Sequence, residues 1–170
     1  MLQIITGMIR YLLAIVMIAY GWVKIIGVQF EIPDDVQNIA LRDLDGVTVA
    51  FAFLGYSKWL AVVSGIVEIS GAILLMFKRT YLFGALILLP VLMYVFLVNI
   101  GYGFSTFMRT WTGGLLLLDI ILLVNNKVIL ENTFSLLMID ACGSGLEWIV
   151  NIFLLVAVII GLSLLIPTLM

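Results

Sequence analysis

The sequence contains no histidine and a single cysteine, Cys142. Without histidine, the chain by itself cannot form a bis-His haem site, a His-ligated zinc site or a Ser-His-Asp triad. A single cysteine excludes an internal disulfide, a CxxC redox pair and a four-thiolate iron–sulfur site. We therefore expect no metal site and no intrinsic cofactor, so any redox role would need a bound quinone or a partner's cofactor.

Charged residues are also scarce, at 11% of the chain, whereas hydrophobic residues make up 65%. Soluble domains carry about 25% charged and about 45–50% apolar residues. A chain of 170 residues is too small to bury that excess, so the lipid bilayer is the expected solvent. The formal net charge of −2 gives no basic patch, so nucleic acid is not an expected partner.

Several apolar stretches have the length of about 20 residues that a membrane-spanning helix needs. They cover residues 4–28, 59–77, 82–102 and 107–124, and a fifth covers residues 148–165. Two shorter stretches, 47–54 and 128–139, are predicted not to span, and whether they enter the membrane is left open. The sequence thus predicts an all-α integral membrane protein: a four-helix transmembrane bundle with an additional C-terminal transmembrane helix.

Basic residues indicate the orientation of these helices. Lys78 and Arg79 are adjacent in the short loop after the second stretch, and short cytoplasmic loops are enriched in such residues. The 78–81 loop and the N-terminus are therefore predicted to be cytoplasmic, and residues 29–57 to lie outside.

The outer segment shows a helical pattern of its own. Pro33 and Asp34 form a helix start signal. The apolar residues that follow at helical spacing are Val36, Ile39, Ala40 and Leu44. This pattern predicts an amphipathic helix on the outer surface that caps the bundle.

Ionisable side chains within the predicted spans are the most informative residues, because each costs about 2.5–3.5 kcal/mol at mid-bilayer. Glu68 lies near the middle of the second span and Asp119 in the inner half of the fourth. Arg10 lies toward the inner end of the first span and Lys24 toward its outer end. Depth matching predicts an intramembrane ion pair between Arg10 and Asp119.

Glu68 is predicted by the same reasoning to contact Lys24, Tyr20 or Asn99, which lie in the outer half. Two interpretations stay open. The contact either fixes only the register of the helices, or Glu68 handles a proton or hydrogen-bonds a carbonyl-bearing ligand such as a quinone. A Glu68→Gln change separates them, because a register contact tolerates it with modest loss of stability, whereas a functional site loses activity while the protein still folds.

These polar residues belong to an ordered series of short motifs. They are Arg10-Tyr11-Leu12-Leu13-Ala14, Tyr20-Gly21-Trp22-Val23-Lys24, Gly65-Ile66-Val67-Glu68-Ile69-Ser70-Gly71-Ala72 and Val98-Asn99. In this order the motifs resemble the DoxX-like family of small bacterial membrane proteins, over residues 8–126. The resemblance implies a four-helix core at 1–126 in the bacterial cytoplasmic (inner) membrane, in which Arg10, Lys24, Glu68 and Asn99 match recurring polar residues. Residues 127–170 have no counterpart and are predicted to form an interfacial segment and the fifth helix.

The resemblance also implies a function, because named members of the family are, or are similar to, small subunits of thiosulfate:quinone oxidoreductases. We expect an accessory or non-catalytic subunit of an inner-membrane complex, associated with another membrane subunit or a second copy, and not an enzyme on its own. A quinone would contact Glu68. Two alternatives stay open: an interaction, assembly or immunity protein without ligand chemistry, and a small proton-coupled transporter that uses Glu68 and Asp119.

Overall fold

A computed structural model describes residues 2–31, 39–137, 149, 152–153 and 156. Within these residues the chain is helical and contains no strand. It divides into two compact units, residues 1–130 and 131–170. The first unit holds all of the long helices that the structure describes. The predicted domain boundary, after residue 126, lies slightly earlier in the chain than this division between the two units.

Four of the described helices are long and apolar enough to cross a membrane. They are α1 (Leu2–Ile25), α3 (Lys58–Met76), α4 (Tyr81–Gly101) and α5 (Thr106–Val124). Their bounds agree with the first four predicted spans to within about three residues, and the prediction of an all-α membrane bundle is confirmed. The fifth predicted span, 148–165, lies outside the described residues except at positions 149, 152, 153 and 156.

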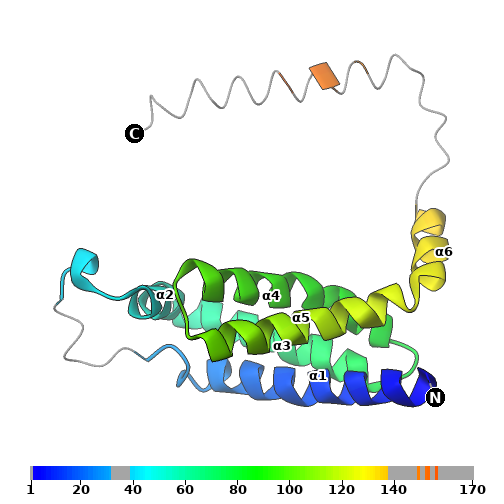
Figure 1. Cartoon of the computed structure of the whole chain (residues 1–170), viewed down its shortest axis with the longest axis horizontal. Coiled ribbons are helices and arrows are strands. Elements are labelled where there is room, and N and C mark those ends of the chain that lie inside the picture. The colour runs from blue at the N-terminus through cyan, green and yellow to red at the C-terminus, as the bar shows by residue number, and fades with distance from the viewer. Residues whose placement is uncertain (1, 32–38, 138–148, 150–151, 154–155, 157–170) are drawn as a thin grey trace. The chain divides into compact units, whose positions relative to one another are not determined.

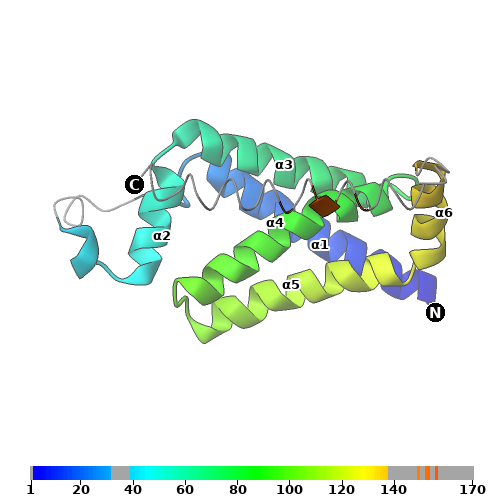
Figure 2. The same cartoon turned by 90° about the horizontal axis from the view of Figure 1, so that it is seen from above.

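The spanning helices pack in the ring order α1, α3, α4, α5, with α5 closing against α1. Neighbours in the ring are antiparallel (Figures 1 and 2). Arg10 near the start of α1 bonds to the last residues of α3, whereas Gly21 near the end of α1 packs on Gly65 near the start of α3. Buried leucine, alanine and methionine side chains from all four helices fill the centre of the ring.

Glycine sets the closest approach between α1 and α3. A Cβ atom on Gly21 would lie 2.6 Å from the backbone oxygen of Gly65, and one on Gly65 would lie 2.5 Å from the backbone oxygen of Gly21. Only glycine allows two helix backbones to come this close. Because residues three apart share a helix face, the contact also brings Lys24 and Glu68 to the same seam.

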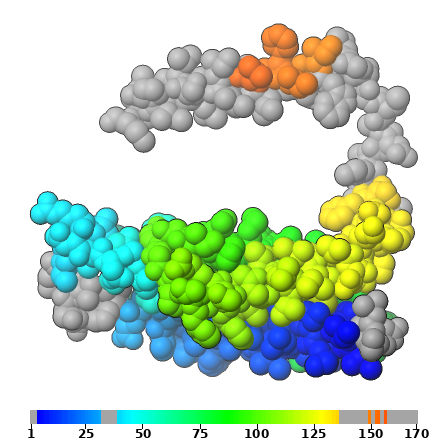
Figure 3. Space-filling view, viewed as in Figure 1, coloured from blue at the N-terminus to red at the C-terminus, as the bar shows by residue number. Residues whose placement is uncertain are grey.

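The short helix α2 (Gly46–Gly55) lies at one end of this ring and contacts α3 (Figures 1 and 3). We call this end of the bundle the α2 end. With ten residues, α2 is about 15 Å long and cannot cross a bilayer, so the stretch 47–54 does not span, as predicted. Helix α6 (Lys127–Leu137) has eleven residues and is likewise too short.

The predicted amphipathic helix does not run through the residues before α2. Its predicted start at Pro33 and Asp34 lies outside the described residues, and Leu41–Asp43 forms only a 3-10 helix, η1, with no buried side chain. The backbone is extended on both sides of η1, at Ala40 and at Leu44, and an extended residue interrupts a helix. Helix α2 begins separately after Asp45, whose carboxylate accepts hydrogen bonds from the first amides of α2 as an N-cap residue does.

Candidate functional site

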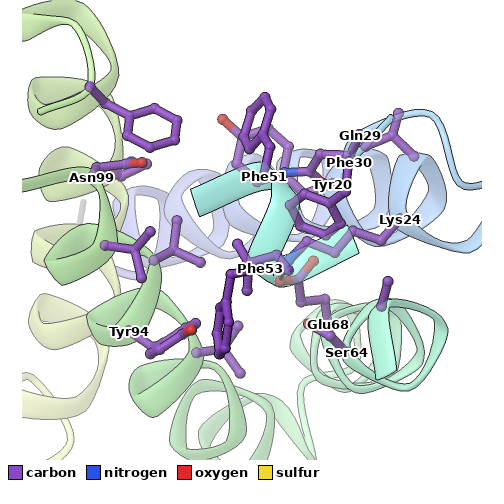
Figure 4. A pocket seen from close by; sticks show the side chains of 18 of the residues that line it. Tyr20, Lys24, Gln29, Phe30, Phe51, Phe53, Ser64, Glu68, Tyr94 and Asn99 are labelled. Atoms are coloured by element: carbon purple, nitrogen blue, oxygen red, sulfur yellow. Dashed lines mark hydrogen bonds and ion pairs between the residues drawn. The ribbon is translucent and has the colours of Figure 1, made fainter. Parts of the chain in front are cut away.

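The ring encloses a cavity of about 560 Å³ at the α2 end (Figure 4). The loop after α1, helix α2 and all four spanning helices contribute to its wall. Most lining side chains are apolar or aromatic. The volume falls within the range of about 300–1,000 Å³ that is typical of small-molecule sites. This cavity is the candidate site.

A buried ion pair lies in the cavity wall. Lys24 Nζ of α1 donates a hydrogen bond to Glu68 Oε1 of α3, and the two residues are 5% and 0% exposed. Of the three contacts predicted for Glu68, this is the one that the structure contains. The second carboxylate oxygen, Oε2, is buried and has no hydrogen-bond partner among the described residues. Glu68 therefore has a vacant acceptor beside the cavity.

The remaining predicted ligand residues lie in the same wall. Asn99 Nδ2 donates to Thr112 Oγ1 at 3.0 Å, which ties α4 to α5, and Trp111 Nε1 donates to the Tyr20 hydroxyl at 2.9 Å, which ties α5 to α1. Gln29 also lines the cavity, and its side-chain oxygen is a second buried acceptor without a partner in the described part of the chain. The cavity thus brings Tyr20, Lys24, Glu68 and Asn99 together, although α1, α3 and α4 supply them separately.

Aromatic residues that the sequence did not single out close the α2 end of the cavity. The Phe30 and Phe51 rings meet edge to face with centroids 5.8 Å apart, and the Phe51 and Phe104 rings do so at 5.7 Å. These three residues come from the loop after α1, from α2 and from the turn before α5. The N-cap signal at Asp45, followed by an apolar run, is the sequence feature that could have placed Phe51 on a covering helix.

Arg10 does not pair with Asp119, so that prediction is wrong. Arg10 Nε donates to the backbone oxygen of Leu75 at 2.9 Å, and a terminal guanidinium nitrogen donates to that of Met76 at 2.9 Å. The guanidinium also lies 4.7 Å from the centroid of the Tyr81 ring. The last carbonyls of a helix lack partners within the helix and form the negative end of its dipole. The end of α3 thus attracts the arginine in place of a carboxylate.

Asp119 is the second fully buried carboxylate of the bundle, at 0% exposure. Neither of its side-chain oxygens has a hydrogen-bond partner among the described residues. It does not line the cavity, and its neighbours on the same face of α5, Leu115 and Leu122, belong to the hydrophobic core. Across the described ranges, no group of three or more His, Cys, Asp or Glu side chains could hold a metal ion.

Comparison with known proteins relates the chain to a membrane family. The DoxX family model matches residues 5–100. The uncharacterized protein YwoB of Bacillus subtilis (strain 168) is 34% identical over 91 residues. That match covers 53% of this chain and 57% of YwoB, so the chain spans little more than half the length of this curated relative. No solved structure matches the chain significantly. The family match includes Tyr20, Lys24, Glu68 and Asn99 and ends before α5.

Proposed function

The chain belongs to the DoxX family, and from this membership and its cavity we propose that it is an accessory subunit of a bacterial inner-membrane complex that binds a quinone-class molecule. The observation that carries the proposal is the Lys24–Glu68 ion pair, which is buried in the wall of a mostly apolar cavity. A few placed polar groups within apolar walls are what a small-molecule site needs to orient its ligand.

The residues present fit a planar ring that carries oxygen atoms. Glu68 Oε2 is a free acceptor, and an ammonium group such as that of Lys24 has three donors, of which one bonds Glu68. The Phe51 and Tyr94 rings in the wall offer apolar faces for stacking. A bound quinone would supply two-electron and proton chemistry that the side chains of this protein do not provide. The chain itself would bind the head group, orient it and exclude water.

The orientation and the partner belong to the same proposal. The basic pair Lys78 and Arg79 in the loop between α3 and α4 supports a cytoplasmic location for that end, which would place the α2 end and its cavity on the outside. Electrons would come from another membrane subunit bound to this chain. Alternatively, the chain would associate with a second copy of itself as a homo-oligomer. The bilayer surrounds the four spanning helices in either case.

Native mass spectrometry of protein gently extracted from its host membrane tests the proposal. The wild type should carry a mass increment that matches a quinone, and Glu68→Gln should lose most of it. Glu131→Gln is the matched control, because it makes the same chemical change at an exposed position on α6 and should keep the ligand. A spectrum with a bound polypeptide and no small molecule would instead favour an interaction or assembly protein without ligand chemistry.

One observation favours a second candidate, a small proton-coupled transporter. Asp119 is fully buried, and its two side-chain oxygens have no hydrogen-bond partner among the described residues. An intramembrane carboxylate in such a position is expected to have a functional role. Glu68 and Asp119 would then be successive proton sites. In proteoliposomes, solute flux driven by a proton gradient should disappear in Asp119→Asn if this candidate is correct.

A further inference from the structure

The cavity is closed toward the α2 end and open on one flank. The Phe30, Phe51 and Phe104 rings close the end. Three other lining residues are largely exposed, which indicates that the cavity wall is open where they lie: Phe53 at 68%, Leu60 at 51% and Tyr94 at 50%. Leu60 belongs to α3, Tyr94 to α4 and Phe53 to α2, and Figure 4 shows Phe53 between Tyr94 and the α3 residues Ser64 and Glu68. The opening therefore lies between the halves of α3 and α4 nearest α2.

The packing of α3 and α4 explains why they separate there. At the end away from α2, a Cβ on Gly84 would lie 2.6 Å from the backbone oxygen of Gly71, and a Cβ on Gly71 would lie 2.8 Å from the Leu88 side chain. These close contacts precede Pro90, which lies inside α4 and cannot donate the hydrogen bond that keeps a helix straight. After Pro90, residues of α4 including Tyr94 line the cavity. Figure 2 shows the two helices diverging toward the α2 end.

The opening reaches the depth of the hydrocarbon. Tyr94 lies seven residues before the end of α4 at Gly101, which corresponds to about 10 Å along the helix axis. The flank of a spanning helix at that depth faces lipid tails and not water. Molecules dissolved in the bilayer can therefore reach the opening directly, whereas solutes in water meet the aromatic closure.

We propose that the cavity is loaded sideways from the bilayer, through a portal formed by Phe53, Leu60, Ser64 and Tyr94, by a lipid-dissolved aromatic molecule whose head group carries a hydroxyl donor. This inference rests on the proposed function and narrows it. The portal selects a molecule that partitions into lipid, and the vacant acceptor on Glu68 selects its head group.

The preference for a hydroxyl follows from the chemistry of the buried acceptor. A carboxylate only accepts hydrogen bonds, and Oε2 of Glu68 has no donor among the described residues. The ring oxygens of an oxidised quinone also only accept, so they leave Oε2 unpaired. The hydroxyl groups of the reduced quinol donate and can satisfy it. Leaving a buried acceptor unpaired is unfavourable, so the reduced form should bind more tightly.

Stopped-flow binding of decylubiquinol to the full chain in lipid nanodiscs, followed by quenching of tryptophan fluorescence, tests the portal. Trp111 bonds Tyr20 in the cavity wall and should report occupancy. Ser64→Phe narrows the portal and should slow association about tenfold or more, within the one to three decades over which mutants of one site vary. Ser70→Phe makes the same change at an exposed position on α3 outside the cavity and should leave the rate unchanged.

A second variant protects the test against misfolding. Leu60→Ala removes bulk from the rim and should accelerate association, which a damaged protein would not do. Equal rates for Ser64→Phe, Ser70→Phe and the wild type would overturn the portal while the proposed function stands. Equal affinity for decylubiquinol and decylubiquinone would overturn the hydroxyl assignment. If the wild type binds neither probe, both the portal and the proposed function are wrong.

Discussion

Breaking the Lys24–Glu68 ion pair from one side should cost more stability than removing it entirely. Both residues are buried, at 5% and 0% exposure. Lys24→Met leaves the carboxylate without its counter-charge inside the bundle, and breaking a buried pair in this way costs about 3–5 kcal/mol. Replacing both members by apolar side chains of similar size is often neutral or stabilising. The free energy of unfolding of the double variant Lys24→Met/Glu68→Leu should therefore lie within about 1 kcal/mol of the wild-type value.

The two single variants should also differ from each other, because only one of the two charged groups can move toward water when its partner is removed. Glu68 is at least eight residues from either end of α3, about 12 Å along the axis, so its charge cannot reach water. Lys24 is one residue from the end of α1, and a lysine so placed can extend its ammonium group toward the interface. Glu68→Leu should accordingly destabilise the protein less than Lys24→Met does.

The assay is reversible unfolding of the purified protein in mixed micelles by titration with dodecyl sulfate, followed by far-UV circular dichroism. Lys58→Met is the matched control, because it makes the same substitution at an exposed residue at the start of α3; it should change the free energy of unfolding by no more than about 0.5 kcal/mol. A cost below about 1 kcal/mol for Lys24→Met, or single effects that simply add in the double variant, would refute the reasoning, because either result means that the pair is hydrated.

Three further changes test other parts of the bundle. Asp119→Leu removes two buried oxygens that have no partner among the described residues and should raise the free energy of unfolding by about 1–3 kcal/mol, whereas Asp119→Asn should not. A lower free energy of unfolding in Asp119→Leu would mean that a donor bonds the carboxylate. Gly84→Ala places a Cβ 2.6 Å from a backbone oxygen of α3 and should cost about 1–3 kcal/mol, whereas Gly114→Ala, with nothing within 4 Å, should not. The hydrogen bond from the Thr48 hydroxyl is the largest of the causes that hold the pKa of the Asp45 carboxyl below its usual value of 3.8. The cap therefore stabilises α2 above pH 3.8, and this stabilisation is lost as the pH falls below that value. In an NMR titration, the chemical shifts of the first amides of α2 should change below pH 3.8 in the wild type and at a higher pH in Thr48→Val.

The four spanning helices could be predicted from the sequence because hydrophobic length alone decides which segments cross a bilayer. The partners of the buried charges could be predicted only in part. Depth along the membrane normal follows from residue counts, and it left three candidate partners for Glu68, of which Lys24 is the one in contact. The direction in which each helix faces does not follow from depth. Arg10 and Asp119 lie at similar predicted depths, yet the free carbonyls at the end of α3 bind the arginine instead.

The candidate site was predicted as four polar residues without the cavity that joins them. Tyr20, Lys24, Glu68 and Asn99 stood out because polar groups are rare inside spans. The aromatic wall did not, because the stretch 47–54, which contains Phe51 and Phe53, was predicted only as non-spanning and its relation to the bundle was left open. The start of α2 is marked by the N-cap residue Asp45. A capping residue gives a weaker sequence signal than a long apolar run.

The ion pair between α1 and α3 also constrains how the protein can be made. The two partners are 44 residues apart in the chain, so the ribosome delivers Lys24 to the membrane well before Glu68. Glu68 alone costs about 2.5–3.5 kcal/mol to insert near the centre of its helix, and Lys24 lowers this cost once both helices are side by side. We therefore expect α3 to insert most readily against an α1 that is already in place, so that the two helices form a hairpin with the non-spanning α2 in its turn.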